Sequence, residues 1–232
     1  MALTAGAALA LQSGMSDAGA AAACPATSVT VGGEGPAMEV VDGEIRLATP
    51  TEAEADLTLE LSTVAVHRGS TPVNLTVVTT TEVSPDWIIT VRKELAETAQ
   101  RIAGGVEQSW CFGRLPRGQG DLVVRVQAYV AAKRGNIVPT YPGIEAANGN
   151  TPEGIPLHYP GLVDAQYHHG TWIDAAGRRS PVTARFVDSA IELTVPAALI
   201  AETTFPAVLD PTVVVTPNDV PPLASATNGQ KA

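Results

Sequence analysis

Histidine and carboxylate side chains stand close together in residues 158–174 of this chain. Imidazole and carboxylate groups are common ligands of zinc and related metals, and a metal bound by them can activate water. A secreted metal-dependent hydrolase is therefore one hypothesis for the chain. Its candidate residues are His158, Asp164, His168, His169 and Asp174.

The spacing of these histidines argues against a shared metal. His168 and His169 are adjacent, and successive side chains of an extended strand point to opposite faces of a sheet. His158 can face one of them only if the two segments pair as a hairpin, and cross-strand histidines are more often ordinary half-exposed sheet residues. Asp174 opens the segment DAAG, which is typical of a turn that ends in glycine.

Other catalytic patterns are weak in this sequence. Paired carboxylates of the glycosidase type need acidic residues on facing strands, and Glu107, Asp164 and Asp174 are candidates that an acidic chain supplies by chance. The segment containing Ser109 and Cys111 has no recognisable nucleophile motif and reads as a strand that crosses the core. We therefore expect a protein that is not an enzyme, without catalytic, metal-binding or cofactor-binding residues.

Aromatic residues are concentrated in the second half of the chain. An exposed group of such rings is typical of a face that contacts carbohydrate or protein, so a carbohydrate-binding module is a further alternative. The opposing interpretation is that Trp172 belongs to the core. The aromatic residues concerned are Tyr141, Tyr159, Tyr167 and Trp172.

Composition favours many short strands over long helices. Hydrophobic residues make up 45% of the 232 residues, but aromatic residues only 4%, and there are 21 glycines and 18 prolines. The formal net charge of -10 repels phosphate backbones, which argues against nucleic acid as a partner. No run approaches the roughly 20 apolar residues that a membrane span needs.

The beginning of the sequence resembles a signal peptide without its positively charged start. An apolar stretch at residues 2–11 is followed by small residues, and the alternative is a disordered low-complexity tail. In an exported protein Cys24 and Cys111 can form a disulfide, whereas the alternative is a buried thiol at Cys111 and an unpaired Cys24. We expect residues 1–26 to be this signal-like or disordered segment, residues 27–216 one β-sandwich domain, and residues 217–232 a disordered linker or tail.

Alternating and β-branched segments predict an all-β fold of mostly antiparallel short strands, with at most one or two short helical turns. Asp42-Gly43 predicts a hairpin turn, and Ile191, Leu193 and Val195 are expected to point inward. Residues 92–108 fit either a helix or further strands, and residues 133–156 a long loop or a short strand between loops. Strands are also expected at residues 55–69, 73–83, 86–91, 106–112 and 121–132, and a helical turn within 196–206.

Motifs in the second half resemble a known kind of domain. They are GVEQSW, LPRGQGDLVVRVQA, HHGTWIDAAGRRSPVTARF and AIELTVPAALIAETTFPAVLDPTVV. Together they look like the β-rich N-terminal domain that precedes FG-GAP, RHS, kelch or other repeat arrays in large secreted proteins of myxobacteria and their relatives. The resemblance covers about residues 106–215 and includes the FPAVLDP segment, in which Pro206 and Pro211 bracket a short strand.

The resemblance implies a location and a role but no chemistry. It implies a non-enzymatic structural or adhesive domain of a secreted or cell-surface bacterial protein, located outside the cell. The expected partner is another protein or a glycan of unidentified structure.

Overall fold

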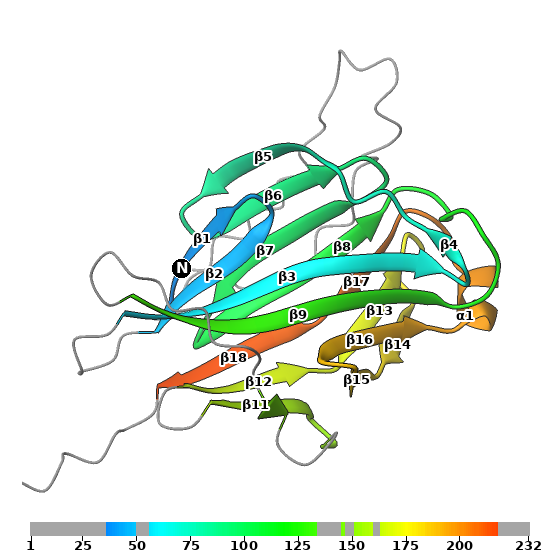
Figure 1. The fold of residues 1–232 in the computed structure, drawn as a ribbon. Coiled ribbons are helices and arrows are strands. Elements are labelled where there is room, and N and C mark those ends of the chain that lie inside the picture. The colour runs from blue at the N-terminus through cyan, green and yellow to red at the C-terminus, as the bar shows by residue number, and fades with distance from the viewer. Residues whose placement is uncertain (1–35, 50–55, 134–144, 147–150, 160–162, 218–232) are drawn as a thin grey trace, which may run out of the picture.

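The chain folds into two antiparallel β-sheets that face each other across a shared core (Figure 1). The computed structural model describes residues 36–49, 56–133, 145–146, 151–159 and 163–217. The expected signal-like segment at residues 1–26 lies outside these ranges, as do residues 218–232 of the expected tail at 217–232 and most of the expected loop at residues 133–156, whereas Pro217 is the last residue of a strand. The predicted all-β sandwich is confirmed.

The first sheet, sheet A, has the strand order β1-β2-β3-β9-β16-β15, and β4 pairs with β3. The bounds of its strands are β1 Ala37–Val41, β2 Glu44–Thr49, β3 Asp56–Arg68, β4 Thr71–Pro72, β9 Leu122–Lys133, β15 Ala184–Val187 and β16 Ala190–Val195.

The second sheet, sheet B, has the order β10-β11-β12-β18-β8-β17-β13-β14, and β5, β6 and β7 continue it from the other side of β8. The bounds of its strands are β5 Val77–Ser84, β6 Trp87–Arg92, β7 Ala96–Ile102, β8 Gly105–Phe112, β10 Glu145–Ala146, β11 Gly154–Tyr159, β12 Val163–His168, β13 Gly170–Asp174, β14 Arg179–Val182, β17 Ala207–Asp210 and β18 Thr212–Pro217.

Alternation of residue types along the strands builds the core. In β16, Ile191, Leu193 and Val195 are fully buried, as the alternation predicts. Leu59 and Leu61 of β3 are also fully buried and belong to the same cluster, which includes residues of both sheets. Burying such side chains contributes about 1.5–3 kcal/mol each relative to leaving them exposed.

The central strand of sheet B, β8, is buried along its whole length. Its edge away from β7 is shared by two strands, because β17 pairs with residues 110–112 and β18 with residues 105–107. Pro211 lies between these two strands, and its carbonyl accepts a hydrogen bond from the N–H of Gln108 at 3.1 Å. Sheet B therefore divides at Pro211 into one branch through β13 and another through β12.

The helix considered for residues 92–108 is absent, and the alternative of further strands is correct. β7 and β8 form a hairpin in which Gly104 has a φ of +74°. Leu95 and Ala99 are buried in the core, while Ile102 is only half-buried. The helical spacing of these three residues was outweighed by pairing of the segment with β6 and β8.

The turns predicted at Asp42-Gly43 and at Gly177 and the helical turn predicted within residues 196–206 are confirmed. The β1–β2 hairpin turns at Asp42 and Gly43, which have φ values of 53° and 83°. Gly177 ends the turn after β13 with a φ of +77°. A single short helix in the described part of the chain, α1 (Ala197–Ala201), supplies the expected helical turn before β17.

Candidate functional site

The pairing of β11 with β12 decides which histidines can meet. His158 lies opposite Asp164 in this hairpin, whereas His168 lies opposite Gly154. His158 and His168 are therefore separated along the strands by the four residue steps from position 154 to position 158, about 13 Å of extended chain. The hypothesis that His158 faces one of the adjacent pair is wrong for His168. The pair His158 and Asp164 is brought together by register, although both side chains lie outside the described part of the structure.

His169 serves the fold through its ring. It lies between β12 and β13, and its Nδ1 accepts a hydrogen bond from the backbone N–H of Ala184 at 3.1 Å. This bond joins the corner between β12 and β13 to β15 of the opposite sheet. Because the lone pair of Nδ1 is occupied, the neutral ring carries its proton on Nε2.

Asp174 is held inside a turn by five donors. Its Oδ1 accepts the N–H groups of Ala176 and Arg178 at 3.0 and 2.9 Å. Its Oδ2 accepts the N–H of Thr204 at 3.3 Å, and Nε and Nη2 of Arg178 at 2.8 Å each. The hydrogen bonds from the Arg178 side chain are the main cause that lowers the pKa of Asp174 from 3.8 to about 2. Asp174 therefore stabilises the turn that the DAAG pattern predicted and also fixes it to the segment after α1, which that pattern did not indicate.

A shallow hollow of about 410 Å³ lies between this turn and α1. Three of its charged residues already bind each other, since Arg178 pairs with Asp174 and also donates to the backbone carbonyl of Glu202. Trp172 is at its base and donates from Nε1 to Oγ1 of Thr203 at 2.9 Å.

Trp172 and Tyr167 do not form an exposed aromatic face. Trp172 is 1% exposed and Tyr167 is fully buried. The Trp172 ring lies between Phe112 and Phe205, with ring centroids at 5.8 and 6.4 Å. The alternative of a carbohydrate-contacting face is therefore wrong for these two residues, because their rings fill the core, and the opposing interpretation that Trp172 belongs to the core is confirmed. Tyr141 and the side chain of Tyr159 lie outside the described residues.

A network of buried polar side chains joins five strands inside the core. Its centre is Glu97, whose Oε1 accepts hydrogen bonds from the hydroxyl of Thr63 at 2.7 Å and from Nε2 of Gln108 at 2.8 Å. Thr63 in turn accepts the indole N–H of Trp110 at 3.0 Å, and Tyr167 donates to Oε1 of Gln108 at 3.2 Å. Burial, followed by the nearby charge of Glu97, raises the pKa of Tyr167 well above 10.0.

Arg92 completes this network from β6. Its Nε and Nη2 donate to Oε2 of Glu97, and its other nitrogen contacts reach the carbonyls of Leu75 and Gly43 at 2.9 and 3.2 Å. The bond to Gly43 ties the β1–β2 turn of sheet A to sheet B. The network therefore links the two sheets, and of its residues the sequence analysis singled out only Tyr167, as an aromatic contact residue and not as part of a buried network.

A pair of acidic residues lies on the face of sheet B that points away from the core. Glu107 of β8 hydrogen-bonds Asp210 of β17, and burial together with the charge of Glu107 raises the pKa of Asp210 from 3.8 to about 8. Arg179 opposes this shift with its positive charge. Glu107 was a sequence candidate, and the partner that the structure shows for it, Asp210, was not among the candidates. The alternation within AVLD could have placed Asp210 on this face, but the pairing depends on how β17 and β18 divide at Pro211.

Cys111 lies on the same face of β8. It is 4% exposed, clusters with Ala96 and Val208, and is disulfide-bonded. The alternative of a buried thiol at this position is therefore wrong. Cys24, the other cysteine of the chain, lies outside the described residues.

The loop after β8 presents an exposed apolar residue between two arginines. Leu115 is 48% exposed, and Arg114 and Arg117 are exposed beside it. Arg68 holds the loop by donating from Nη1 to the carbonyl of Pro116 at 2.9 Å. Gly118 has a φ of +103°, and a Cβ there would lie 2.6 Å from the carbonyl oxygen of Arg68, so the loop passes β3 closely.

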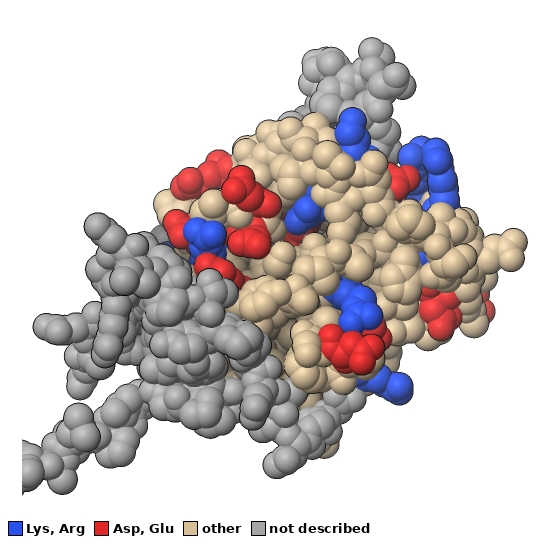
Figure 2. Space-filling view, in the orientation of Figure 1, with Lys and Arg blue, Asp and Glu red and all other residues tan. Residues whose placement is uncertain are grey.

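The described residues contain neither a metal-binding cluster nor a membrane-spanning helix. No group of three or more His, Cys, Asp or Glu residues in that part of the chain is arranged to hold a metal ion. No helix there is long and apolar enough to cross a membrane. On the face shown in Figure 2, acidic and basic side chains of the described residues are interspersed rather than gathered into a basic stripe.

The fold and these sites define an all-β sandwich with buried polar networks. No family model, no curated protein and no solved structure matches the chain.

Proposed function

We propose that this protein is a non-enzymatic, exported β-sandwich domain with a structural or adhesive role in a secreted or cell-surface protein. The observation that carries the proposal is that buried and half-buried polar side chains bind other parts of the fold. Asp174 caps a turn, His169 accepts a backbone N–H, and Glu97 links the two sheets. A catalytic group needs hydrogen-bond reach to a substrate, whereas these groups bind neighbouring strands.

The disulfide at Cys111 supports the export part of the proposal. Disulfides persist in oxidising compartments and are rare in the cytosol. The signal-like segment at residues 1–26 and the resemblance of residues 106–215 to domains of large secreted repeat proteins point in the same direction, and both stay predictions.

The loop of residues 114–117 is the contact surface that we assign to the adhesive role. An exposed leucine flanked by arginines combines apolar area with donors for carboxylate or carbonyl groups. The hydrogen bond from Arg68 and the close approach at Gly118 restrain the loop, so that little conformational entropy is lost when it binds a partner. The partner that we expect this loop to bind is a protein or a glycan.

A display experiment tests this role. The domain is placed on the surface of non-adherent bacterial cells, and attachment of these cells to protein-coated and polysaccharide-coated surfaces is measured. We expect these cells to attach more strongly than cells that do not display the domain. Attachment should decrease markedly when Arg114→Ser and Leu115→Ser are combined. The matched control combines Arg185→Ser with Val187→Ser, an exposed arginine and an exposed apolar residue of β15.

Two outcomes would contradict the proposal. Display without any gain in attachment removes the adhesive role, and an equal decrease in the control removes the assignment to the loop. Surface abundance of each variant is measured with an epitope tag, so that poor folding is not mistaken for lost adhesion.

A further inference from the structure

The outer edge of sheet B is formed by β5, a strand of eight residues. β5 pairs with β6 on one side, and within the described part of the chain no strand pairs with its other side. Every residue from Val77 to Val83 is exposed. An open edge presents backbone N–H and C=O groups that a further strand can bind.

β5 is the longest open strand edge that the structure describes, since β1, at the edge of sheet A, has five residues and carries Glu39, and β4 has only two residues. β14 carries Arg179 and Pro181, which hinder further pairing, β15 carries Arg185, and β10 has only two residues. β5 contains no proline, lysine or arginine and consists mainly of valine and threonine, which favour strand pairing.

We propose that β5 pairs with β5 of a second copy of this chain, antiparallel about a two-fold axis at Thr80. The strand VVTTTEVS is nearly symmetric about that residue, so Thr79 meets Thr81 and Val77 meets Val83. Such threonine and β-branched pairs stabilise antiparallel strands. The same register sets Glu82 opposite Val78, which keeps the glutamates of the two copies apart.

Irregular pairing limits the strength of this contact. The register of β5 against β6 shifts between Val77 and Thr79 and again between Glu82 and Ser84. The regular part of the strand is therefore residues 79–82, and bulges at its ends twist the remaining edge. The dimer is expected to be weak and to dissociate on dilution.

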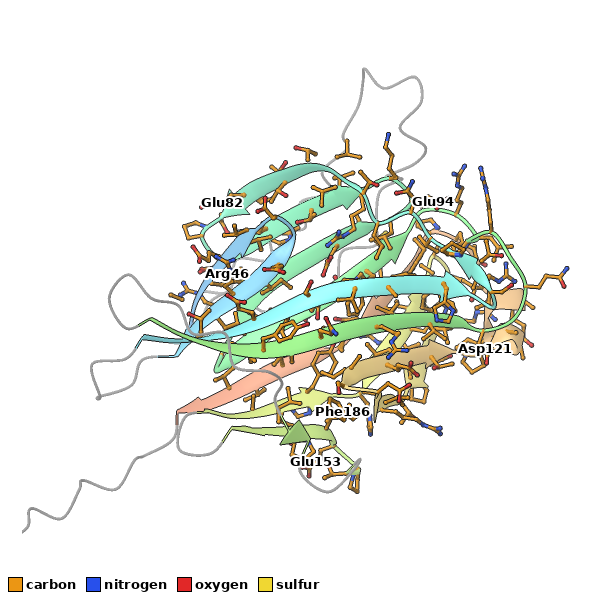
Figure 3. The ribbon with its side chains drawn as sticks, in the orientation of Figure 1. Arg46, Glu82, Glu94, Asp121, Glu153 and Phe186 are labelled. Carbon is orange, nitrogen blue, oxygen red and sulfur yellow. The ribbon has the colours of Figure 1, made fainter. Side chains whose placement is uncertain are left out.

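Charge along the strand favours the antiparallel arrangement. Lys93 is exposed at the beginning of β5, where its backbone N–H donates to the carbonyl of Thr76 at 3.0 Å. Glu82 lies at the other end, and Figure 3 shows it far along the strand from Glu94. Two-fold pairing sets Lys93 of each copy level with Ser84 of the other, two strand spacings away and two residues along the strand from Glu82, which places Lys93 and Glu82 about 12 Å apart, slightly more than the Debye length of about 8–10 Å. Glu94 offsets part of this attraction, although its Oε2 accepts the N–H of Asn74 at 2.6 Å.

Analytical ultracentrifugation across a dilution series tests the dimer, and its result does not depend on the adhesive role. We expect wild type to pass from dimer to monomer on dilution. Thr80→Lys sets two like charges opposite each other on the axis and should weaken association by at least about 10-fold. Thr183→Lys, at an exposed threonine between β14 and β15, is the matched control and should associate like wild type.

The two-fold register has its own test. Lys93→Glu and Glu82→Lys should each weaken the dimer, and the double variant should restore it. Thr80→Cys should form a disulfide-linked dimer under mild oxidation, whereas Thr183→Cys should not. Wild type that stays monomeric at every concentration overturns the proposal, and so does unchanged association of a folded Thr80→Lys variant, with folding checked by circular dichroism and thermal melting.

Discussion

Nε and Nη2 of Arg92 both donate to Oε2 of Glu97, at 3.0 and 2.8 Å, in a buried ion pair between β6 and β7. The side chains are 7% and 3% exposed, so water screens this pair little. The second carboxylate oxygen of Glu97 is occupied by Thr63 and Gln108. Because removing one partner leaves a buried charge without compensation, this pair constrains how the two sheets meet.

Replacing Arg92 tests the importance of this pair. Arg92→Met should lower the free energy of unfolding by about 3–5 kcal/mol, because Glu97 stays buried without its cation. Urea denaturation measures the loss. Arg46→Met is the control, since Arg46 pairs with Glu39 and Glu60 at the surface, where ion pairs contribute about 0–1 kcal/mol. Equal losses in the two variants would contradict the structural role of Arg92.

Gly105 tests the branch point of sheet B. A Cβ at this position would lie 1.9 Å from the carbonyl oxygen of Val213, so Gly105→Ala must separate β8 from β18. We expect a loss of more than about 2 kcal/mol in unfolding free energy. Gly177→Ala has nothing within 4 Å of its new Cβ and should lose only about 1 kcal/mol through its positive φ. A similar loss in both variants would show that the close approach is relieved without consequence.

Asp174 predicts a stability change in acid. Its pKa is lowered in the folded chain from 3.8 to about 2, so its contribution is complete above about pH 4 and is lost as the pH falls toward 2. Asp174→Asn should destabilise the protein by about 1–3 kcal/mol at neutral pH, because the amide loses the charge-assisted bonds with Arg178. Urea midpoints measured from neutral pH to pH 2 should converge for the two proteins. A constant difference across that range would refute the assignment.

The strand pattern made most of the fold predictable. Alternation with a period of two gave the buried positions of β16, and Asp42-Gly43 gave the β1–β2 turn. The segment that became β7 was ambiguous, because Leu95, Ala99 and Ile102 also fit helical spacing. Its structure depends on pairing with β6 and β8, which local sequence does not encode.

The polar sites were predictable only where their contacts are local. The turn at Asp174 could be inferred because its partners lie within four residues, apart from Thr204. The network around Glu97 could not, since Thr63 reaches it from the point where the register of β3 shifts. Pairing of Glu107 with Asp210 likewise follows from the division at Pro211, and not from the spacing of acidic residues.

Asp210 predicts the opposite response to pH. Its pKa is raised from 3.8 to about 8, so the folded chain holds a proton that the unfolded chain releases above about pH 4. Its stabilising contribution is complete below that pH and is lost as the pH rises through 8. Asp210→Asn keeps a neutral donor for Glu107 and should therefore gain stability relative to wild type between about pH 4 and 8. Urea midpoints test this, with Asp188→Asn in the exposed turn before β16 as the control. A fixed difference between Asp210→Asn and wild type over this pH range would show that Asp210 carries no extra proton.

The disulfide at Cys111 gives a prediction about the part of the chain before β1. Cys111 is disulfide-bonded and the sequence has one other cysteine, so we expect peptide mapping of the unreduced protein to link the peptides that contain Cys24 and Cys111. A bond that closes so long a loop restricts the unfolded chain, and reduction should lower the free energy of unfolding by about 2–4 kcal/mol. Cys111→Ala should behave like reduced wild type and should not respond further to reductant. Alkylation of Cys24 in the unreduced, denatured protein, or a disulfide-linked dimer on a non-reducing gel, would contradict the intramolecular pair.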